Sequence, residues 1–561
     1  MHSDLGTNGV KRPLEAFLVA ALLVAQGALL VHGLRADGLT NDEIIYVPMG
    51  CQQLFAGDYR TNPTHPPLAP VLAASGLVGL PLKLSERQPG ETELAWAHRF
   101  FHLENDAGRL LSRARLPFVC LALLLALVVW AWARLEAGPA AGLVALGFFT
   151  FHPSLLAHGH LATTDLAGCF VTTLAAFAFW GWLRRPSLAR GVAFGLALGL
   201  TAATRLTGAL VLPAVAVAAL VHWHRARPTE RGAFLQRLLI LTAVSAALTL
   251  TVVWGAYRFR YQPYPGASVA EPVRPRLGRI GRAVLWAEGH RMLPEAYLEA
   301  VRFQLEHNRS GHPSYLLGAH SQTGFRGYYL VAFLVKNTPG FLLAMGLAAV
   351  ALWRRRGGHS SFEWLCLSAA LAVLLGASLG RIQIGERYLL PAYPFLILLL
   401  AAGWRALEDW RWRPHALGIA LALHVVPSLL AVPGGHLTYF NRMAGGSQGG
   451  HRVLLDSNLD WGQDLPRLAA WMKGEGVTSV QLAYQGADVP DRFGIAHEDL
   501  PGLHNYPPRP PLAPFTGVVA VSPNLLFGLL PSLGDPYAGL RERSPDARAG
   551  VFFVYRMNPR R

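Results

Sequence analysis

The feature that most limits the fold of this chain is a series of apolar runs, each close to twenty residues long. A run of this length matches the hydrocarbon thickness of a lipid bilayer when it forms a helix. The uninterrupted runs lie at residues 14–34, 115–134, 139–157, 161–183, 235–255, 362–380, 387–403 and 414–432. Two more, at 191–221 and 328–353, are interrupted at 201–208 and 336–339. We therefore predict a mostly α-helical, polytopic membrane bundle of about eleven spans, with two short helices meeting near residue 205.

Composition supports a membrane protein and argues against nucleic-acid binding. The chain has 561 residues, of which 52% are hydrophobic and only 15% are charged, whereas a soluble protein carries about a quarter charged residues. The net charge of +16 is spread over short gaps between apolar runs rather than clustered with aromatic residues. This distribution indicates membrane topology and no nucleic-acid partner.

The basic gaps predict the orientation of the chain. If the N-terminus is cytoplasmic, every internal loop assigned to the cytoplasm is basic, as the positive-inside rule requires. These loops carry Arg134; Arg184, Arg185 and Arg190; Arg225, Arg227, Arg231 and Arg237; Arg354, Arg355 and Arg356; and Arg405, Arg411 and Arg413. The segments on the outer face are then 33–114, 152–160, 256–325 and everything after residue 433.

Domain boundaries follow from a change in the length of the apolar runs. Residues 1–433 carry the spans and form the predicted transmembrane domain, with large outer loops at 33–114 and 256–325. After residue 434 the runs shorten to strand length, at 452–456, 477–484, 516–521 and 551–555, with a helical pattern at 463–473. We expect residues 434–561 to form a small α/β domain outside the membrane.

Two adjacent acids, Asp42 and Glu43, follow the first apolar run within the sequence L-T-N-D-E-I-I-Y. His65 and two prolines, in N-P-T-H-P-P-L, come shortly after them in the same loop. A carboxylate at the membrane surface keeps its charge and still faces lipid-embedded material, which suits a catalytic base. An acid pair that only marks the end of a helix is the alternative.

This loop resembles the first lumenal or periplasmic loop of the protein O-mannosyltransferases and their bacterial relatives in glycosyltransferase family thirty-nine. The lipid A aminoarabinose transferases belong to the same broader class. The sequences H-S-Q-T-G-F-R-G-Y-Y, ending at Tyr329, and D-S-N-L-D-W-G-Q-D, ending at Asp464, look like bacterial family members of unassigned acceptor. The resemblance extends from residue 39 to about residue 465.

The resemblance implies a GT-C fold and an activity. Such enzymes move a sugar from a polyprenyl phosphate to an acceptor hydroxyl at the outer face, with inversion at the anomeric carbon and without a nucleotide-sugar site. The donor partner is then a polyprenyl-phosphate-linked sugar in membrane lipid, and the acceptor is a protein, lipid A or a glycan. The implied location is the bacterial inner membrane, with the C-terminal domain periplasmic or extracellular.

Three acids are the predicted catalytic residues. Asp42 matches the first acid of the family pair and is expected to be the base, with Glu43 orienting the loop or the acceptor. Asp165 stands at the outer start of a span, where an ionisable side chain is costly without a function or a partner. Helix capping by Thr163, Thr164 and Asp165 is the alternative for that stretch.

Three cations at one predicted depth are candidates for the donor phosphate, because charge on the leaving group needs stabilisation where water is scarce. They are Arg205, Lys336 and Arg387, although each could instead anchor its helix at the interface. Arg205 lies in a stretch similar to the family's Thr-Lys-x-x-Gly, with Arg in place of Lys. Support of the loop or the active site is expected from His65, His160, Tyr328 and Tyr329.

Metal binding is not favoured by the motifs. His152, His158, His160 and Asp165 lie close in sequence, but their spacing fits no zinc pattern. The stretch from Asp456 begins like a calcium loop but has Trp461 where glycine is required. We expect no cofactor, with a divalent metal as the less favoured alternative.

Two questions stay open at this stage. The polar-aromatic run 458–464 could bind sugar through Trp461 and its carboxamides or cap the following helix, and capping is slightly favoured. For the whole chain, the alternative is a transporter or flippase of a polyprenyl-linked glycan. That class predicts paired broken helices with charges near mid-membrane, whereas the acids here are expected at one face.

Overall fold

The computed structural model of the chain describes residues 8–61, 64–88, 90–262, 278–355, 358–504, 513–530 and 534–557. Within these residues, eight helices are long and apolar enough to cross a membrane, and up to ten spans result if each of two bent helix pairs is one span. The eight are α1 (Asn8–Ala36), α5 (Ala107–Ala137), α8 (Thr164–Arg184), the 3₁₀ helix η3 (Leu206–Leu210) continued by α10 (Val211–Arg225), α11 (Pro228–Ala256), α16 (Ser361–Leu379), the 3₁₀ helix η5 (Glu386–Ala392) continued by α17 (Tyr393–Ala406), and α18 (Arg413–Leu430). The predicted polytopic helical bundle is confirmed.

Both interrupted runs are broken where the sequence indicated. Helix α9 (Leu188–Thr204) ends at Arg205, whose backbone is extended, and the 3₁₀ helix η3 (Leu206–Leu210) then leads into α10. Helices α14 (Tyr328–Lys336) and α15 (Pro339–Arg354) meet at 112°. The side chain of Thr338 accepts a hydrogen bond from the Phe341 N–H at 3.1 Å, which caps α15 in its new direction. The other bent pair is α6 (Pro139–Thr150) and α7 (Pro153–Gly159), at 64°.

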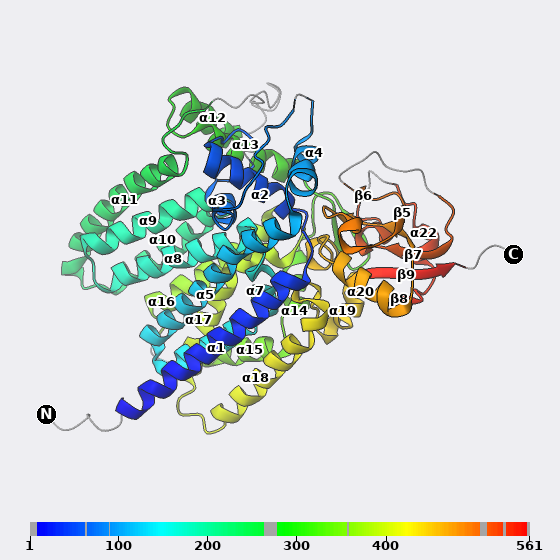
Figure 1. Cartoon of the computed structure of the whole chain (residues 1–561). Coiled ribbons are helices and arrows are strands. Elements are labelled where there is room, and N and C mark those ends of the chain that lie inside the picture. The colour runs from blue at the N-terminus through cyan, green and yellow to red at the C-terminus, as the bar shows by residue number, and fades with distance from the viewer. Residues whose placement is uncertain are drawn as a thin grey trace.

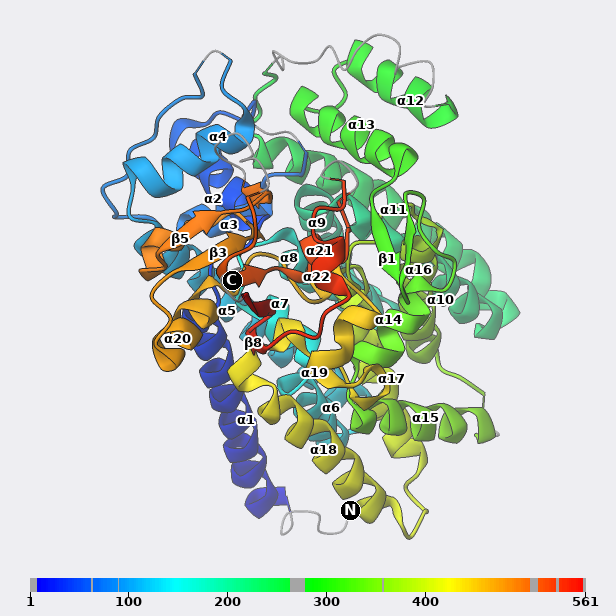
Figure 2. The same ribbon diagram turned by 90° about the vertical axis from the view of Figure 1, so that its right-hand side faces the viewer.

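The short helices between the spans gather at one end of the bundle. Figure 2 shows α2, α4, α12 and α13 at the top and the start of α1 at the bottom. The bounds at this upper end are α2 (Glu43–Cys51), α3 (Leu68–Ser75), α4 (Glu93–His98), α12 (Gly278–Gly289), α13 (Glu295–Ser310), β1 (Ser314–Leu316) and β2 (Ala319–Ser321). The loops that carry the predicted acids therefore share one end of the molecule.

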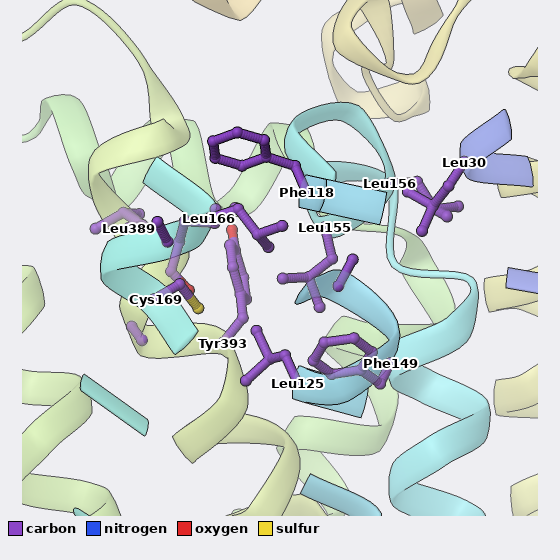
Figure 3. Close-up of a cluster of buried hydrophobic side chains, with 14 of the residues drawn as sticks. Leu30, Phe118, Leu125, Phe149, Leu155, Leu156, Leu166, Cys169, Leu389 and Tyr393 are labelled. Atoms are coloured by element: carbon purple, nitrogen blue, oxygen red, sulfur yellow. The ribbon is translucent and has the colours of Figure 1, made fainter. Parts of the chain in front are cut away.

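The bundle core fixes the helices that approach this end. Figure 3 shows Leu125 of α5, Phe149 of α6, Leu155 of α7, Leu166 of α8 and Tyr393 of α17 packed together, all at most 1% exposed. Large apolar side chains on the outside of the bundle are exposed instead, as a surface in contact with lipid requires. The buried contacts hold α7 and α8, and so the segment between them, in a set position.

A five-stranded sheet follows the bundle, with strand order β5-β3-β7-β9-β8. Strand β3 pairs in parallel with β5 and β7, and β9 runs antiparallel to β7 and β8. The bounds are α19 (Gly446–Gly449), α20 (Leu465–Glu475), β3 (Val480–Ala483), β4 (Gln485–Gly486), β5 (His497–Asp499), β6 (Leu503–His504), β7 (Gly517–Val521), α21 (Pro523–Leu526), α22 (Ala538–Arg541), β8 (Ala547–Ala549) and β9 (Phe552–Met557). The α/β character of the C-terminal region is confirmed (Figure 1).

One predicted strand, at 452–456, is wrong. These residues lie in and between two 3₁₀ turns, and their only ladder contact among the described residues is the single bridge between Leu316 and Leu454. Leu454 and Leu455 are fully buried by packing, which explains the apolar run without a strand. Asp456 then adopts a positive φ of 59°, which ends the extended backbone.

The C-terminal region is bound directly to the chain that follows α1. The Gly38 N–H donates to the Gln463 carbonyl at 2.8 Å, and the Asn41 N–H donates to the Trp461 carbonyl at 3.0 Å. The Leu39 N–H donates to the Asp488 carboxylate at 3.0 Å. Because these bonds come just before Asp42, the sheet region fixes the position of the predicted base.

Candidate functional site

Asp42 lies immediately before α2 at the upper end of the bundle. Its Oδ2 accepts a hydrogen bond from the Arg387 guanidinium at 2.7 Å, and its side chain is 26% exposed. Among the described residues, no hydrogen-bond donor contacts Oδ1. Asp42 therefore combines a fixed position with one free carboxylate oxygen.

Asp165 and Arg205 continue this group of charges. Asp165 begins α8 and is paired with Arg205, which stands at the break between α9 and η3. Arg387 Nη1 lies 3.5 Å from Asp165 Oδ2 as well as 2.7 Å from Asp42. Two acids and two arginines from four distant segments thus alternate in one cluster, and three of these four side chains are nearly buried. Alternation allows such charges to remain ionised away from water.

Glu43 points away from this cluster. Its carboxylate pairs with Arg115 of α5 at 2.7 and 2.8 Å, and neither side chain is exposed to solvent. It also accepts hydrogen bonds from the Thr40 hydroxyl and the Ala162 N–H, both at 2.9 Å. Burial opposes ionisation, but the Arg115 guanidinium holds the pKa of Glu43 below its ordinary value. Glu43 is thus tied to Arg115 and the surrounding backbone and does not contact the charge cluster.

Arg115 is the residue that sequence reasoning missed most clearly. Besides Glu43, its guanidinium donates to the backbone carbonyls of Leu34, Asp37 and Gly38 at 3.1, 2.7 and 2.7 Å. It therefore holds the turn between α1 and Asp42 in place. The signal in the sequence is an arginine at the start of the apolar run 115–134, a position that is also typical of an interfacial anchor.

Lys336 has a different set of bonding partners from Arg205 and Arg387. Its ammonium group donates to the carbonyls of Leu437 and Asn458 at 2.8 and 2.7 Å and lies 4.4 Å from the centre of the Phe440 ring. These contacts tie the end of α14 to the segment that leads into the C-terminal region. Two of its three donors are used, so its predicted contact with phosphate has less support than that of the arginines.

The predicted supporting residues, His65, His160, Tyr328 and Tyr329, lie around the charge cluster and bond to neighbouring segments. His65 packs edge-on against Tyr46, with ring centres 5.3 Å apart, and burial lowers its pKa to about 4, so it is neutral. His160 binds the Asp37 carboxylate at 3.0 Å. Tyr328 accepts a hydrogen bond from Asn458 at 2.9 Å and Tyr329 donates to the Ile382 carbonyl at 3.3 Å. The two tyrosines are buried and support the backbone just before Arg387 rather than the reacting groups.

The histidines proposed as an alternative metal site do not converge. His152 packs between Phe341 and Tyr393, whereas His160 is bound to Asp37. Over the described ranges, no group of three or more His, Cys, Asp or Glu side chains is arranged to hold a metal ion.

Trp461 contacts the cluster from the C-terminal region. The Arg387 guanidinium lies 4.1 Å from the centre of the Trp461 ring, which is 3% exposed. The favoured capping role for this run is wrong, since no side-chain cap is formed at the start of α20. Asp464, at that position, binds Arg467 and the Val551 N–H instead. Trp461 and Asn458 are therefore part of the site's surroundings.

A cavity of about 720 Å³ opens beside the charge cluster. Its polar end contains Arg205, His65 and Tyr388. The rest of its lining is largely apolar and comes mainly from η3, α13 and α16, including Leu210 and Val373. An amphipathic ligand with an anionic head and an apolar tail fits this arrangement of charge and apolar surface.

Residues 59–257 match the family model described as dolichyl-phosphate-mannose-protein mannosyltransferase. The chain has a fold of the GT-C type. Its fold is that of ArnT from Cupriavidus metallidurans in the apo state, with a TM-score of 0.50 and 16% identity over 97% of this chain and 98% of that chain. No curated protein sequence matches this chain significantly.

Two further solved structures are similar at lower scores. ArnT from Cupriavidus metallidurans bound to undecaprenyl phosphate matches at a TM-score of 0.47, 16% identity and coverage of 96% and 97%. The Archaeoglobus fulgidus oligosaccharyltransferase in the apo form matches at 0.46 and 13% identity, over 89% of this chain and 62% of that one.

Proposed function

We propose that this chain is a GT-C glycosyltransferase, which transfers a sugar from a polyprenyl-phosphate-linked donor to an acceptor hydroxyl with inversion. The observation that carries the proposal is the cavity whose apolar lining ends at Arg205, next to Asp165, Arg387 and Asp42. A lipid phosphate needs both parts, an apolar channel for its chain and a cation for its head. The description of the matching family names a donor of this class, a dolichyl-phosphate sugar.

The chemistry assigns one function to each charge. The acceptor oxygen attacks the anomeric carbon while the bond from that carbon to the phosphate oxygen breaks. Asp42 takes the hydroxyl proton on its free Oδ1, and general bases of this kind contribute about 10²–10⁴-fold. Arg205, and Arg387 when it exchanges a carboxylate contact, stabilise the charge left on the polyprenyl phosphate. Asp165 holds both arginines in position.

The proposal includes an orientation. Ion pairs and hydrogen bonds join the basic loops at the end where α1 begins, including Arg134 with Glu15 at 2.7 Å and Arg405 with the Glu136 carbonyl at 2.8 Å. By the positive-inside rule this end is cytoplasmic, which places Asp42 and the sheet on the outer face. We place the enzyme in the bacterial inner membrane with its C-terminal region periplasmic or extracellular.

The test is donor consumption by purified protein in lipid nanodiscs, with a panel of radiolabelled polyprenyl-phosphate sugars. We expect wild type to release polyprenyl phosphate and Asp42→Asn to be about 10²–10⁴-fold slower. The matched control is Asp58→Asn, which removes an acid from the same loop that pairs only with the exposed Arg60. If the lipids bind but wild type consumes none of them, the transporter alternative replaces the enzyme.

A further inference from the structure

A short turn of the C-terminal region is held directly against the backbone that precedes Arg387. In η10 (Asp456–Asn458), the Ser457 hydroxyl donates to the Ile384 carbonyl at 2.7 Å. The Asn458 side chain accepts a hydrogen bond from the Glu386 N–H at 2.8 Å. The turn cannot shift without breaking bonds on both sides, so it forms a fixed wall next to Arg387.

Asp456 begins this turn in an unusual conformation. Its φ of 59° lies in the left-handed region, and its N–H donates to the Asn524 side chain at 2.8 Å. Its Oδ1 accepts the Ser457 N–H at 2.6 Å. Among the described residues, no cationic side chain lies within ion-pair distance of its carboxylate, and no donor contacts Oδ2. One carboxylate oxygen therefore lacks a protein partner.

The electrostatic neighbours of Asp456 include two members of the charge cluster. Burial raises its pKa to about 7, while Arg387 lowers it and Asp42 raises it. Asp456 thus lies close to the two groups at which the acceptor must react. It does not contribute to the cavity lining, which reaches the cluster at Arg205 on the other side of Asp165. Asp456 is therefore near the cluster but not part of the donor cavity, and we assign it to the acceptor side.

The charges on this side do not suit a phosphate-bearing acceptor. Arg387 is already shared between Asp42 and Asp165. His312, another ionisable group that interacts with Arg387 and Asp42, has its pKa lowered by burial and is uncharged at neutral pH. An anionic acceptor would meet the carboxylates of Asp42 and Asp456, and the guanidinium that interacts with both, Arg387, is already paired. Sugar hydroxyls can instead donate to both carboxylates.

We propose that Asp456 binds the acceptor by accepting a hydrogen bond from a hydroxyl next to the attacking one, and that the acceptor is a neutral glycan. This inference rests on the proposed function. A glycan offers adjacent hydroxyls for Asp42 and Asp456 together, whereas a serine or threonine side chain offers one.

The positive φ of Asp456 limits the substitutions that can test its function without straining the backbone. Asp456→Asn and Asp456→Gly both tolerate the left-handed region, whereas alanine would add backbone strain. Asparagine keeps an acceptor oxygen without the charge, and glycine removes the side chain. Asp460→Asn is the matched control, because that acid lies on the same segment and its carboxylate bonds to the Gly462 N–H at 3.1 Å and interacts with Ser522, away from Arg387 and Asp42.

The assay uses the full-length protein in nanodiscs, the donor that wild type consumes, and three probes. These are fluorescent lactose, the same disaccharide carrying a phosphate monoester, and a threonine-containing peptide. We expect wild type to label lactose best. Asp456→Gly should raise the KM for lactose about 10- to 100-fold, the value of a hydrogen bond to a charged group. Asp456→Asn should raise it less and improve use of the phosphorylated probe, while the KM for the donor stays within twofold.

Several results would overturn the inference. One is that wild type labels the phosphorylated disaccharide or the peptide better than lactose. Another is that the sugar is transferred to water alone, and a third is that the KM for lactose is unchanged in both Asp456 variants. An equal effect of Asp460→Asn would show that the segment acts only through folding. Absence of donor consumption by wild type is a different result, because it removes the proposed function itself.

Discussion

The buried pair between Glu43 and Arg115 provides the sharpest test of how this site is held. Arg115→Leu removes five hydrogen bonds, two to the Glu43 carboxylate and three to backbone carbonyls of the turn after α1. Both side chains are 0% exposed, so the remaining carboxylate would be left without water or an opposite charge. Removing one member of such a pair costs about 3–5 kcal/mol.

The expected effect is large enough to measure in a membrane protein. For a chain of 561 residues, with an unfolding entropy of about 1.2 kcal/mol/K, 3–5 kcal/mol corresponds to a fall in Tm of roughly 2.5–4 °C. The assay is thermal unfolding followed by loss of the monodisperse peak in size-exclusion chromatography. Arg109→Leu is the control on the same helix, since Arg109 is exposed and pairs only with the exposed Asp106. We expect that control to change stability by no more than about 0.5 kcal/mol.

Two variants separate structure from catalysis. Replacing both partners with leucine should destabilise less than the sum of the single changes, because neither charge is left unpaired. Glu43→Gln should lower stability while the folded fraction retains activity within about tenfold, because Glu43 does not contact the charge cluster. A Glu43→Gln protein with wild-type Tm and a hundredfold lower kcat would refute this reasoning and make Glu43 a catalytic group.

Three other outcomes are expected. Trp461→Ala should lower kcat about tenfold in steady-state kinetics, because it removes a buried cation–π contact with Arg387. Trp461→Phe should keep most of the wild-type kcat, and an equal loss in both variants would contradict this role of the ring. Ala377→Trp, in the cavity lining, should raise the KM for the donor with little change in kcat, and an unchanged KM would place the lipid elsewhere. The pKa of His65 is about 4 in the folded protein, below the ordinary histidine value near 6.5. Neutral His65 therefore contributes its full stabilisation above pH 6.5, and this contribution is lost as the pH falls from 6.5 to 4. His65→Gln should flatten the dependence of Tm on pH in that window, and an unaltered slope would show that His65 is not its source.

Much of the fold could be predicted because it depends on local pattern. Hydropathy over about twenty residues locates the spans, and the polar interruptions locate the breaks at Arg205 and before Pro339. Strand-length runs located β3, β7 and β9. The failed strand at 452–456 shows the limit of this approach, since burial by tertiary packing produces the same apolar run as a sheet.

The candidate site could be predicted only in part. Asp42, Asp165, Arg205 and Arg387 were selected from separate motifs, and the structure brings all four together. Lys336 was predicted at the same depth but is bound to backbone carbonyls instead. Depth in a membrane follows from position along a span, whereas the direction in which a side chain points around the helix depends on its neighbours.

The sequence alone determined that this chain crosses a membrane many times, where its helices break, and that acids follow its first span. Only the tertiary structure decided that Glu43 pairs with Arg115, 72 residues away, and that Asp42 pairs with Arg387, 345 residues away. Hydropathy and turn chemistry act between near neighbours and can be recognised in one segment. Pairing of buried charges depends on which helices pack together, and that is set by the whole core at once.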